Sequence, residues 1–253
     1  MSYQDKNEPP YPQNQKECND YCDRLVAALS TKLQHRLVCV LLSGSWATGE
    51  AKPPKSDIDI SVVVDFVDDN LLDTLSEAWK QSKTGYANIY GLDEIEAMSH
   101  EAFHMYTFNA VVLYGTNPFP YPNKKDLALD LAATTEGLAR MARNIEYAYW
   151  LSEEEISGNL SYMLGKDCLR RTLQNLVAFR TGLYPGKASE CLKLLENYSE
   201  FEFITWLESL SDQQKLQQHR IIARKLSHLA REWFKEIRDF RIKSDNGTVI
   251  NIT

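Results

Sequence analysis

The sequence lacks any long uncharged hydrophobic run, and this excludes a membrane-spanning helix, which needs about 20 consecutive apolar residues. The first thirty residues lack the apolar core of a signal peptide, so we expect a cytoplasmic protein. Positive charge is scarce as well, because 28 Lys and Arg residues stand against 35 Asp and Glu residues, for a formal charge of -7. A nucleic-acid partner is therefore not expected, since binding a polyanion needs a clustered basic face.

Cysteine is scarce and odd in number, with five residues in the chain. Without a secretion signal, this predicts reduced thiols rather than disulfides. Cys18 and Cys22 are four residues apart and can share one helix face. No second cysteine pair or nearby histidine completes a zinc site, so we expect two small buried apolar side chains.

What the chain does contain is an ordinary globular composition with one conspicuous boundary. Hydrophobic residues make up 43% of its 253 residues, which suits one large domain or two modest ones. Three prolines alternate with other residues within 116–123 and stiffen that segment into an extended connector. We predict a flexible arm over 1–16, an α/β domain over 17–117 and an all-helical domain over 118–253.

Hydrophobic periodicity predicts the elements of each domain. In the first domain it indicates helices over 15–34, 68–82 and 93–114, and strands over 37–42, 58–64 and 85–90. In the second domain it indicates helices over 124–151, 153–182, 186–197, 200–208 and 211–239, followed by a terminal strand or tail over 241–253. Ser152 precedes three glutamates and predicts a capping box at a helix start.

A short segment after the first strand has the composition of a phosphate-binding turn. The strand ends in Ser43, Gly44 and Ser45, and glycine lets the backbone come close to a bound group. Residues 45–50 can begin a short helix, whose free amides and partial positive charge favour a phosphate. Ser45 adds a hydroxyl donor.

Two aspartates follow about a dozen residues later, at the entry to the second strand. Asp57 and Asp59 occupy alternate positions, so strand geometry directs both carboxylates to one face while Ile58 and Ile60 point into the core. Two neighbouring hard oxygen ligands suit Mg²⁺, which binds through one or two carboxylates together with substrate phosphates. An isolated pair of this kind would indicate only solvent-exposed aspartates at the beginning of an edge strand. The preceding glycine turn makes the pattern more specific for a phosphate and metal site.

The residues Gly44-Ser45 and Ser56-Asp57-Ile58-Asp59 resemble the signature of the nucleotidyltransferase superfamily that includes DNA polymerase β. Within it they are similar to the small bacterial branch, the minimal nucleotidyltransferases and the aminoglycoside and lincosamide nucleotidyltransferases. The resemblance implies an α+β protein, with a nucleotidyltransferase α/β domain built on a small mixed sheet over 17–117 and a helical C-terminal bundle. Residues 173–195 resemble part of that bundle.

The resemblance also implies an activity. A nucleoside monophosphate would move from a Mg²⁺-bound nucleoside triphosphate, with ATP as the expected nucleotide, to a hydroxyl of a small acceptor such as an aminoglycoside-like antibiotic. Asp57 and Asp59 would be the catalytic, Mg²⁺-binding residues, and Gly44, Ser45 and Ser56 would bind the nucleotide. Pyrophosphate would leave, and the helical halves of two copies would form a homodimer.

One expected group is missing from the sequence. Family members usually have a third carboxylate on the next strand, as metal ligand or general base, but residues 85–90 contain no acid. Asn88 stands near the expected place and cannot accept a proton at neutral pH. Glu94 lies just beyond and fits the first turn of a helix, while Glu136 and Glu146 are unranked candidates for the base. The alternative is a catalytically impaired nucleotide-binding protein that acts as a sensor or antitoxin-like partner.

Other patterns compete with this interpretation. Residues 100–104 read His-Glu-Ala-Phe-His, which on a helix would suit a zinc hydrolase; without a third ligand we expect partly exposed helix residues. Arg224 and His228 are spaced too closely for a helical nuclease and indicate a solvated basic face. An RNA-tailing enzyme of the same superfamily is disfavoured by the acidic charge. Four aromatic residues could stack on a ligand ring but are expected in the core: Tyr147, Tyr149, Trp150 and Tyr162.

Overall fold

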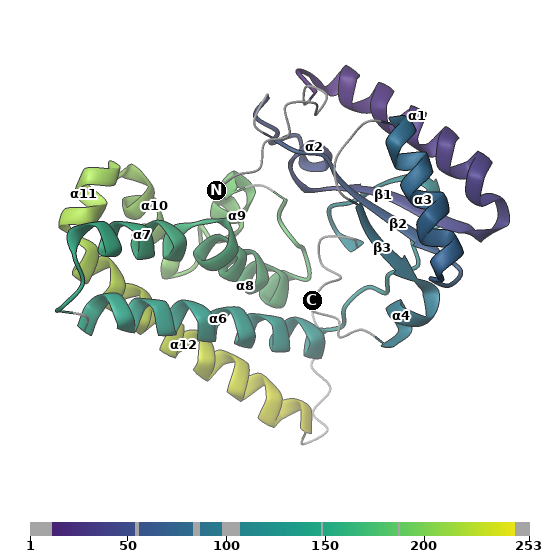
Figure 1. Cartoon of the computed structure of the whole chain (residues 1–253). Helices are drawn as coiled ribbons and strands as arrows, with labels where there is room; N and C mark the ends of the chain where they lie inside the picture. The colour runs from purple at the N-terminus through teal and green to yellow at the C-terminus, as the bar shows by residue number, and fades with distance from the viewer. Residues whose placement is uncertain are drawn as a thin grey trace. The chain divides into compact units, whose positions relative to one another are not determined.

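The structure is a computed structural model that describes residues 12–53, 56–82, 87–97, 107–147, 149–186 and 188–245 (Figure 1). The chain divides into two compact units, Met1–Tyr121 and Pro122–Thr253. Among the described residues, none of the helices combines the length and the apolar character that a bilayer span requires.

The first unit is built on a four-stranded sheet. Its strands are β1 (Leu37–Ser43), β2 (Asp59–Val64), β3 (Ala87–Gly91) and β4 (Val111–Gly115), in the order β3-β2-β1-β4. β1 pairs antiparallel with both β2 and β4, whereas β2 and β3 run parallel. The predicted small mixed sheet is therefore confirmed.

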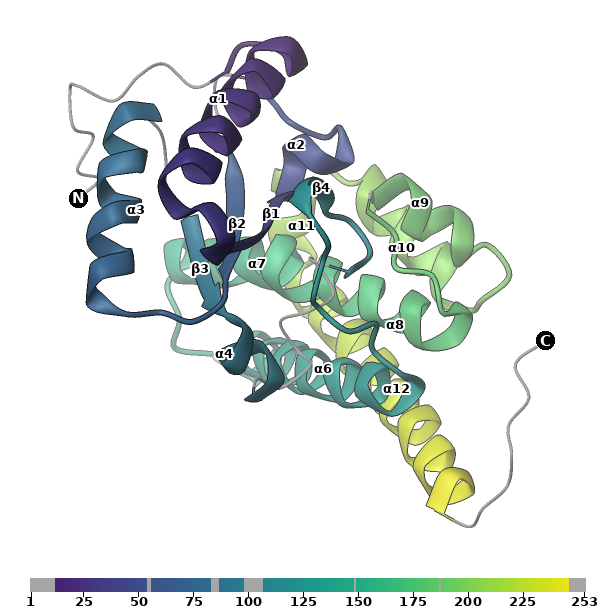
Figure 2. The same ribbon diagram turned by 90° about the vertical axis from the view of Figure 1, so that its right-hand side faces the viewer.

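Two helices cover one face of this sheet. α1 (Gln15–Leu33) and α3 (Asp69–Ser82) pack side by side against it (Figures 1 and 2). Alternate residues of the central strands point toward them and form one apolar cluster with Cys18 and Cys22, which are buried as predicted. Asn14 caps α1 by accepting a hydrogen bond from the backbone N–H of Glu17. The predicted arm over 1–16 is therefore wrong at its end, where two residues are already helical; residues 1–11 lie outside the described part.

The opposite face of the sheet carries a smaller apolar cluster. It includes Cys39, Leu41 and Val63 from the strands, together with Ile95 of α4 (Leu92–Ala97) and Phe119. These strand residues alternate with those facing α1 and α3, as pleated strands require. Because the sheet is buried on both sides at its centre, its strands read as nearly continuous apolar runs.

The predicted helix over 93–114 is wrong in its second half. α4 ends at Ala97, and Val111–Gly115 forms strand β4 beside β1. The apolar residues of this stretch fit a helix or a strand equally well, and the open edge of β1 supplies the hydrogen bonds that decide in favour of a strand. Residues 98–106, which include the His-Glu-Ala-Phe-His pattern, lie outside the described residues.

Helices make up the second unit. They are α6 (Lys124–Tyr147), α7 (Glu153–Leu164), the π-helical segment η3 (Lys166–Arg170), α8 (Arg171–Thr181), α9 (Ala188–Leu194), α10 (Glu200–Ser209), α11 (Asp212–Gln217) and α12 (His219–Asp245). The long helices α6 and α12 pack against each other (Figures 1 and 2). Ser152 and Glu155 form the predicted capping box at the start of α7.

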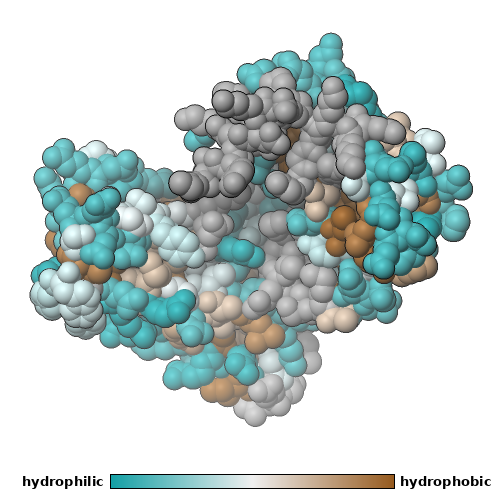
Figure 3. Space-filling view, in the orientation of Figure 1, coloured by the Kyte–Doolittle hydropathy of each residue, from teal (hydrophilic) through white to brown (hydrophobic). Residues whose placement is uncertain are grey.

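Four details of this unit differ from the sequence prediction. The helix expected over 153–182 is interrupted at Gly165, and the helix expected over 211–239 is interrupted at Gln218. Residues 241–245 continue α12 instead of forming a terminal strand or tail. The four aromatic residues expected in the core are exposed, with Trp150 81% exposed. Figure 3 shows that on one face apolar surface residues occur in small groups among hydrophilic ones.

Ser61 on β2 offers a test of the core. Its side chain is fully buried, and its hydroxyl oxygen has no hydrogen-bond partner within the described residues. A buried unpaired hydroxyl costs roughly 1–3 kcal/mol, so we expect Ser61→Ala to raise the free energy of unfolding by about 1 kcal/mol. Urea denaturation of the full chain measures this.

The matched control is Ser43→Ala. Ser43 is also buried, but its hydroxyl donates a 3.4 Å hydrogen bond to the backbone oxygen of Asp59, so its removal should not stabilise the chain. If Ser61→Ala lowered the free energy of unfolding instead, the Ser61 hydroxyl would have a partner in the folded chain.

Candidate functional site

The turn that leaves β1 holds the predicted phosphate-binding residues. After Ser43 the chain enters the short helix α2 (Gly44–Thr48), which ends at Gly49 in the left-handed conformation. Gly44 has a φ of 68°, also in the left-handed region, which glycine adopts without steric cost. Because α2 is little more than one turn, its dipole is small. Phosphate binding here would depend on single N–H groups and on the half-buried Ser45 side chain.

Asp59 lies directly beside this turn. It is the first residue of β2 and pairs in register with Ser43, so the β1–β2 ladder brings the aspartate to the start of α2. A Cβ placed on Gly44 would overlap Oδ2 of Asp59 and lie 2.8 Å from its Cγ. The absence of a side chain at Gly44 therefore leaves the space that the Asp59 carboxylate occupies.

Asp57 lies two residues before Asp59, just ahead of the start of β2. Ile58 and Ile60 are 8% and 1% exposed and belong to the cluster under α1 and α3, which confirms the predicted alternation. Asp57 is exposed and Asp59 is half-buried. Two carboxylates of this kind fit Mg²⁺, which keeps several water or phosphate ligands and needs few from the protein. Within the described residues no group of three or more His, Cys, Asp or Glu side chains could hold a metal, so Asp57 and Asp59 would have to share the ion with a substrate.

Ser56 organises the loop that delivers these aspartates. Its hydroxyl oxygen accepts a hydrogen bond from the backbone N–H of Lys52 at 2.8 Å, and its own N–H donates to the Lys52 carbonyl at 3.2 Å. The indole N–H of the buried Trp46 donates to the Ser56 carbonyl at 3.2 Å. These bonds tie the loop to α2. The Ser56 O–H remains able to donate a further hydrogen bond to a ligand.

β3, which runs parallel to β2, contains no acidic residue that could join this site. Asn88 of β3 is exposed and pairs in register with Ser61, two residues along β2 from Asp59. The carboxylate of Glu94 accepts a 2.7 Å hydrogen bond from the backbone N–H of Gly91 and lies in the first turn of α4, as the sequence predicts. Glu94 therefore binds the backbone N–H group at the start of α4.

The two acids suggested from the helical unit have ordinary surroundings. Glu136 is exposed on α6. Glu146 accepts a 2.9 Å hydrogen bond from Nε of Arg224 and forms an ion pair with it. This pair also accounts for Arg224 in the basic stretch of α12, and the guanidinium of Arg220 lies 4.5 Å from the ring centre of Tyr149. These contacts assign neither acid a role as a base.

Together, these elements define an α+β protein, with a four-stranded mixed sheet in the first unit and helices throughout the second. No known family model matches the chain, and no curated protein matches its sequence. Among solved structures, the chain is similar to the spectinomycin adenyltransferase AAD(9) from Enterococcus faecialis, solved with ATP and spectinomycin. The identity is 14% and the TM-score is 0.45, over 84% of this chain and 99% of that chain.

Proposed function

We propose that this chain is a nucleotidyltransferase that moves a nucleoside monophosphate from Mg²⁺-bound ATP to a hydroxyl of a small molecule. The observation that carries the proposal is the position of Asp59 against the side-chain-free Gly44, at the end of the strand that leads into Ser45. This arrangement supports a site in which one carboxylate and one phosphate-binding turn act on the same ligand.

The residues of the site have distinct parts in the proposed reaction. Asp57 and Asp59 would bind Mg²⁺ on the triphosphate. The backbone N–H groups at Gly44 and Ser45, with the Ser45 hydroxyl, would bind the terminal phosphates, and Ser56 would hold the loop that carries the aspartates. When bound, Mg²⁺ would neutralise charge that develops on the departing pyrophosphate. Positioning and electrostatics would supply most of the rate enhancement.

In the proposed reaction, the acceptor oxygen forms a bond to the α-phosphorus and the bond to the bridging oxygen of the β-phosphate breaks. Pyrophosphate carries away that electron pair, and the hydroxyl proton must pass to a base. Asn88 cannot take it. The formal charge of -7 favours encounter with a cationic acceptor, so a polyhydroxylated amine of the aminoglycoside type is the acceptor class that we propose.

A second candidate is supported by the same strand. Because β3 contains Asn88 and no acid, this second candidate is a protein that binds nucleotide without transferring it. In that case it would act as a nucleotide sensor or as a partner of another protein.

Calorimetric titration of ATP, with and without Mg²⁺, tests the proposed site. We expect wild-type protein to bind ATP only weakly without Mg²⁺, and Asp59→Asn to weaken Mg²⁺-dependent binding at least about tenfold, because charge-assisted contacts contribute about 1.5–3 kcal/mol. The control is Asp73→Asn, an exposed aspartate of α3 in the same unit, which should bind as the wild type does.

Pyrophosphate release in the presence of hydroxylated amines separates the two candidates. Release supports transfer, and binding without release from any acceptor supports the sensor. If the wild type binds no nucleoside triphosphate, both candidates are wrong.

A further inference from the structure

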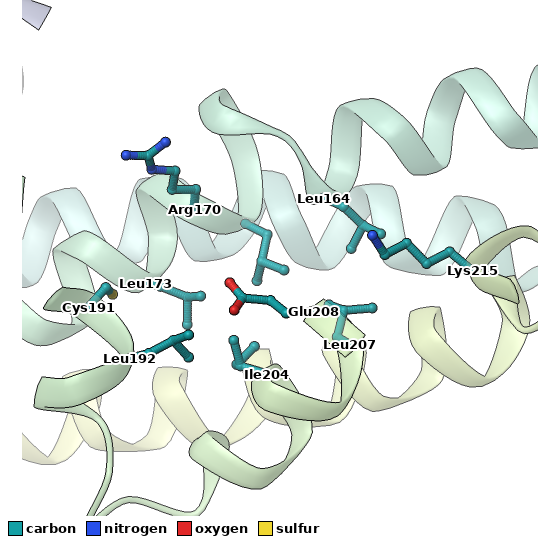
Figure 4. A pocket seen from close by; sticks show the side chains of 10 residues that line it. Leu164, Arg170, Leu173, Cys191, Leu192, Ile204, Leu207, Glu208 and Lys215 are labelled. Carbon is teal, nitrogen blue, oxygen red and sulfur yellow. The ribbon is translucent and has the colours of Figure 1, made fainter. Parts of the chain in front are cut away.

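The helical unit contains a cavity of about 160 Å³ that the nucleotide proposal does not use. Its wall comes from α7, η3, α8, α9 and α10, with α11 at one side (Figure 4). Most of the lining side chains are apolar: Leu164, Leu169, Leu173, Cys191, Leu192, Ile204 and Leu207. A cavity of roughly 150 Å³ with such a lining holds a benzene ring. The space therefore suits a ring or a short branched alkyl group.

Three charged residues border the cavity, and their contacts differ. Lys215 forms an ion pair with Asp212 at 3.6 Å, and Arg170 donates a hydrogen bond to the Gly186 carbonyl at 3.4 Å. The carboxylate of Glu208 has no hydrogen bond or ion pair within the described residues. In Figure 4 this carboxylate lies among the apolar side chains, whereas the guanidinium of Arg170 points away from them. The cavity thus presents an unpaired negative charge beside an apolar space.

Cys191 shows how apolar the wall is. Burial raises the pKa of its thiol to about 12, with a smaller lowering by Arg170 and a smaller rise caused by Glu208. The thiol therefore stays neutral at physiological pH and acts as a small apolar group. Glu208 itself is exposed, so the cavity opens to solvent beside this carboxylate.

We propose that this cavity binds a small primary amine, with its apolar body inside and its ammonium group paired with Glu208 at the mouth. The ligand is proposed to be a cation because the Glu208 carboxylate has no partner among the described residues. The volume of the cavity fits an apolar part of about six to eight carbon atoms. This site is independent of the proposed nucleotide site, since all of its residues belong to the helical unit.

Calorimetry with benzylamine, benzyl alcohol and benzoate on the full chain tests the proposal, since these probes share a ring and differ in charge. We expect benzylamine to bind at least about tenfold more tightly than benzyl alcohol, and benzoate to bind most weakly, because an ammonium group gains a charge-assisted hydrogen bond. Glu208→Gln should remove the preference for benzylamine.

Two variants control for other acidic sites. Glu202→Gln changes an exposed glutamate on the same helix, and Asp59→Asn changes the proposed nucleotide site; both should keep the preference. Benzylamine binding that is unchanged in Glu208→Gln would overturn the proposal, as would tighter binding of benzoate or no binding of any probe. Unchanged circular dichroism and melting of Glu208→Gln would show that its loss of binding is local.

Discussion

Replacing Gly44 with alanine is expected to lower the rate of the proposed nucleotidyl transfer about a hundredfold, because a displacement of about 1 Å at a reacting group can cost that much. The new Cβ would overlap the Asp59 carboxylate and displace it. The left-handed backbone at Gly44, with a φ of 68°, adds a strain of about 1–2 kcal/mol for a residue with a Cβ. Pyrophosphate release and ATP calorimetry measure the loss of function, and urea denaturation measures the strain.

Gly182→Ala is the matched control for this variant. Gly182 has a φ of 73°, so its backbone strain is the same, but a Cβ placed there meets nothing within 4 Å. Gly182→Ala should therefore lose similar stability and keep its nucleotide binding. If Gly44→Ala bound Mg²⁺-ATP and transferred nucleotide as the wild type does, the proposed role of Asp59 would be wrong.

Arg180→Met should destabilise the helical unit by about 3–5 kcal/mol, the usual cost of removing one partner from a buried ion pair. Arg180 donates hydrogen bonds to Glu200 at 3.0 Å and to Glu236 at 2.7 Å. Glu200 is only 3% exposed, and its carboxylate also accepts hydrogen bonds from the indole N–H of Trp233 at 2.7 Å and from the Ser199 hydroxyl at 3.5 Å. Without Arg180, Glu200 would be a buried charge with only neutral hydrogen-bond donors. Urea denaturation followed by tryptophan fluorescence measures the change.

The pH dependence of this network has a definite sign. Burial acts to raise the pKa of Glu200, but the hydrogen bonds from Arg180 and Trp233 outweigh it, and the pKa lies below its usual value. A lowered folded pKa contributes stability that is present above the unfolded pKa of about 4.3 and is lost as the pH falls through the folded pKa. In Arg180→Met, burial raises the pKa of Glu200 with less opposition from hydrogen bonds, so Glu200 takes up a proton at a higher pH than in the wild type. The difference in free energy of unfolding between variant and wild type should therefore shrink as the pH falls from 7 to 4.

Two further variants isolate the buried charge as the cause. Glu236 is the more exposed partner of Arg180, with 36% of its side chain exposed. Glu236→Gln should therefore lower the free energy of unfolding by about 1 kcal/mol or less. Adding Glu200→Gln to Arg180→Met should recover most of the lost stability, because the buried charge is then gone. If the double variant were as unstable as Arg180→Met, Arg180 would act by packing over Tyr198, whose ring centre lies 4.3 Å from the guanidinium carbon of Arg180.

The sequence predicts the elements of this fold best where chain-local signals agree. The β-branched run 58–64 becomes β2, and the capping box at Ser152 and Glu155 begins α7. It fails where a distant partner decides the outcome. Val111–Gly115 is apolar in either conformation, and only its pairing with β1 makes it a strand. No local signal separates Tyr149 and Trp150, which are exposed, from core aromatic residues.

The candidate site divides in the same way. Alternation alone predicts that Asp57 and Asp59 share a face opposite Ile58 and Ile60. The burial of the two isoleucines confirms their part of this pattern, and the shared face of the two carboxylates stays a prediction. Their roles with ATP and Mg²⁺ stay predictions. The contact between Gly44 and Asp59 depends on the register of β1 with β2, which spacing along the chain does not define. Glu208 has no sequence signal at all, because its cavity forms only when the successive helices from α7 to α11 pack together.

The strand order also has a consequence for synthesis on the ribosome. β1 is complete at Ser43, yet its second neighbour, β4, begins only at Val111. At about 5–20 residues per second, one edge of the nascent central strand waits roughly 3–14 s for its partner. An unpaired apolar edge is a template for pairing with other chains. The nascent chain is therefore most exposed to aggregation in this interval, and a chaperone that binds extended apolar segments would protect it most if it acted then.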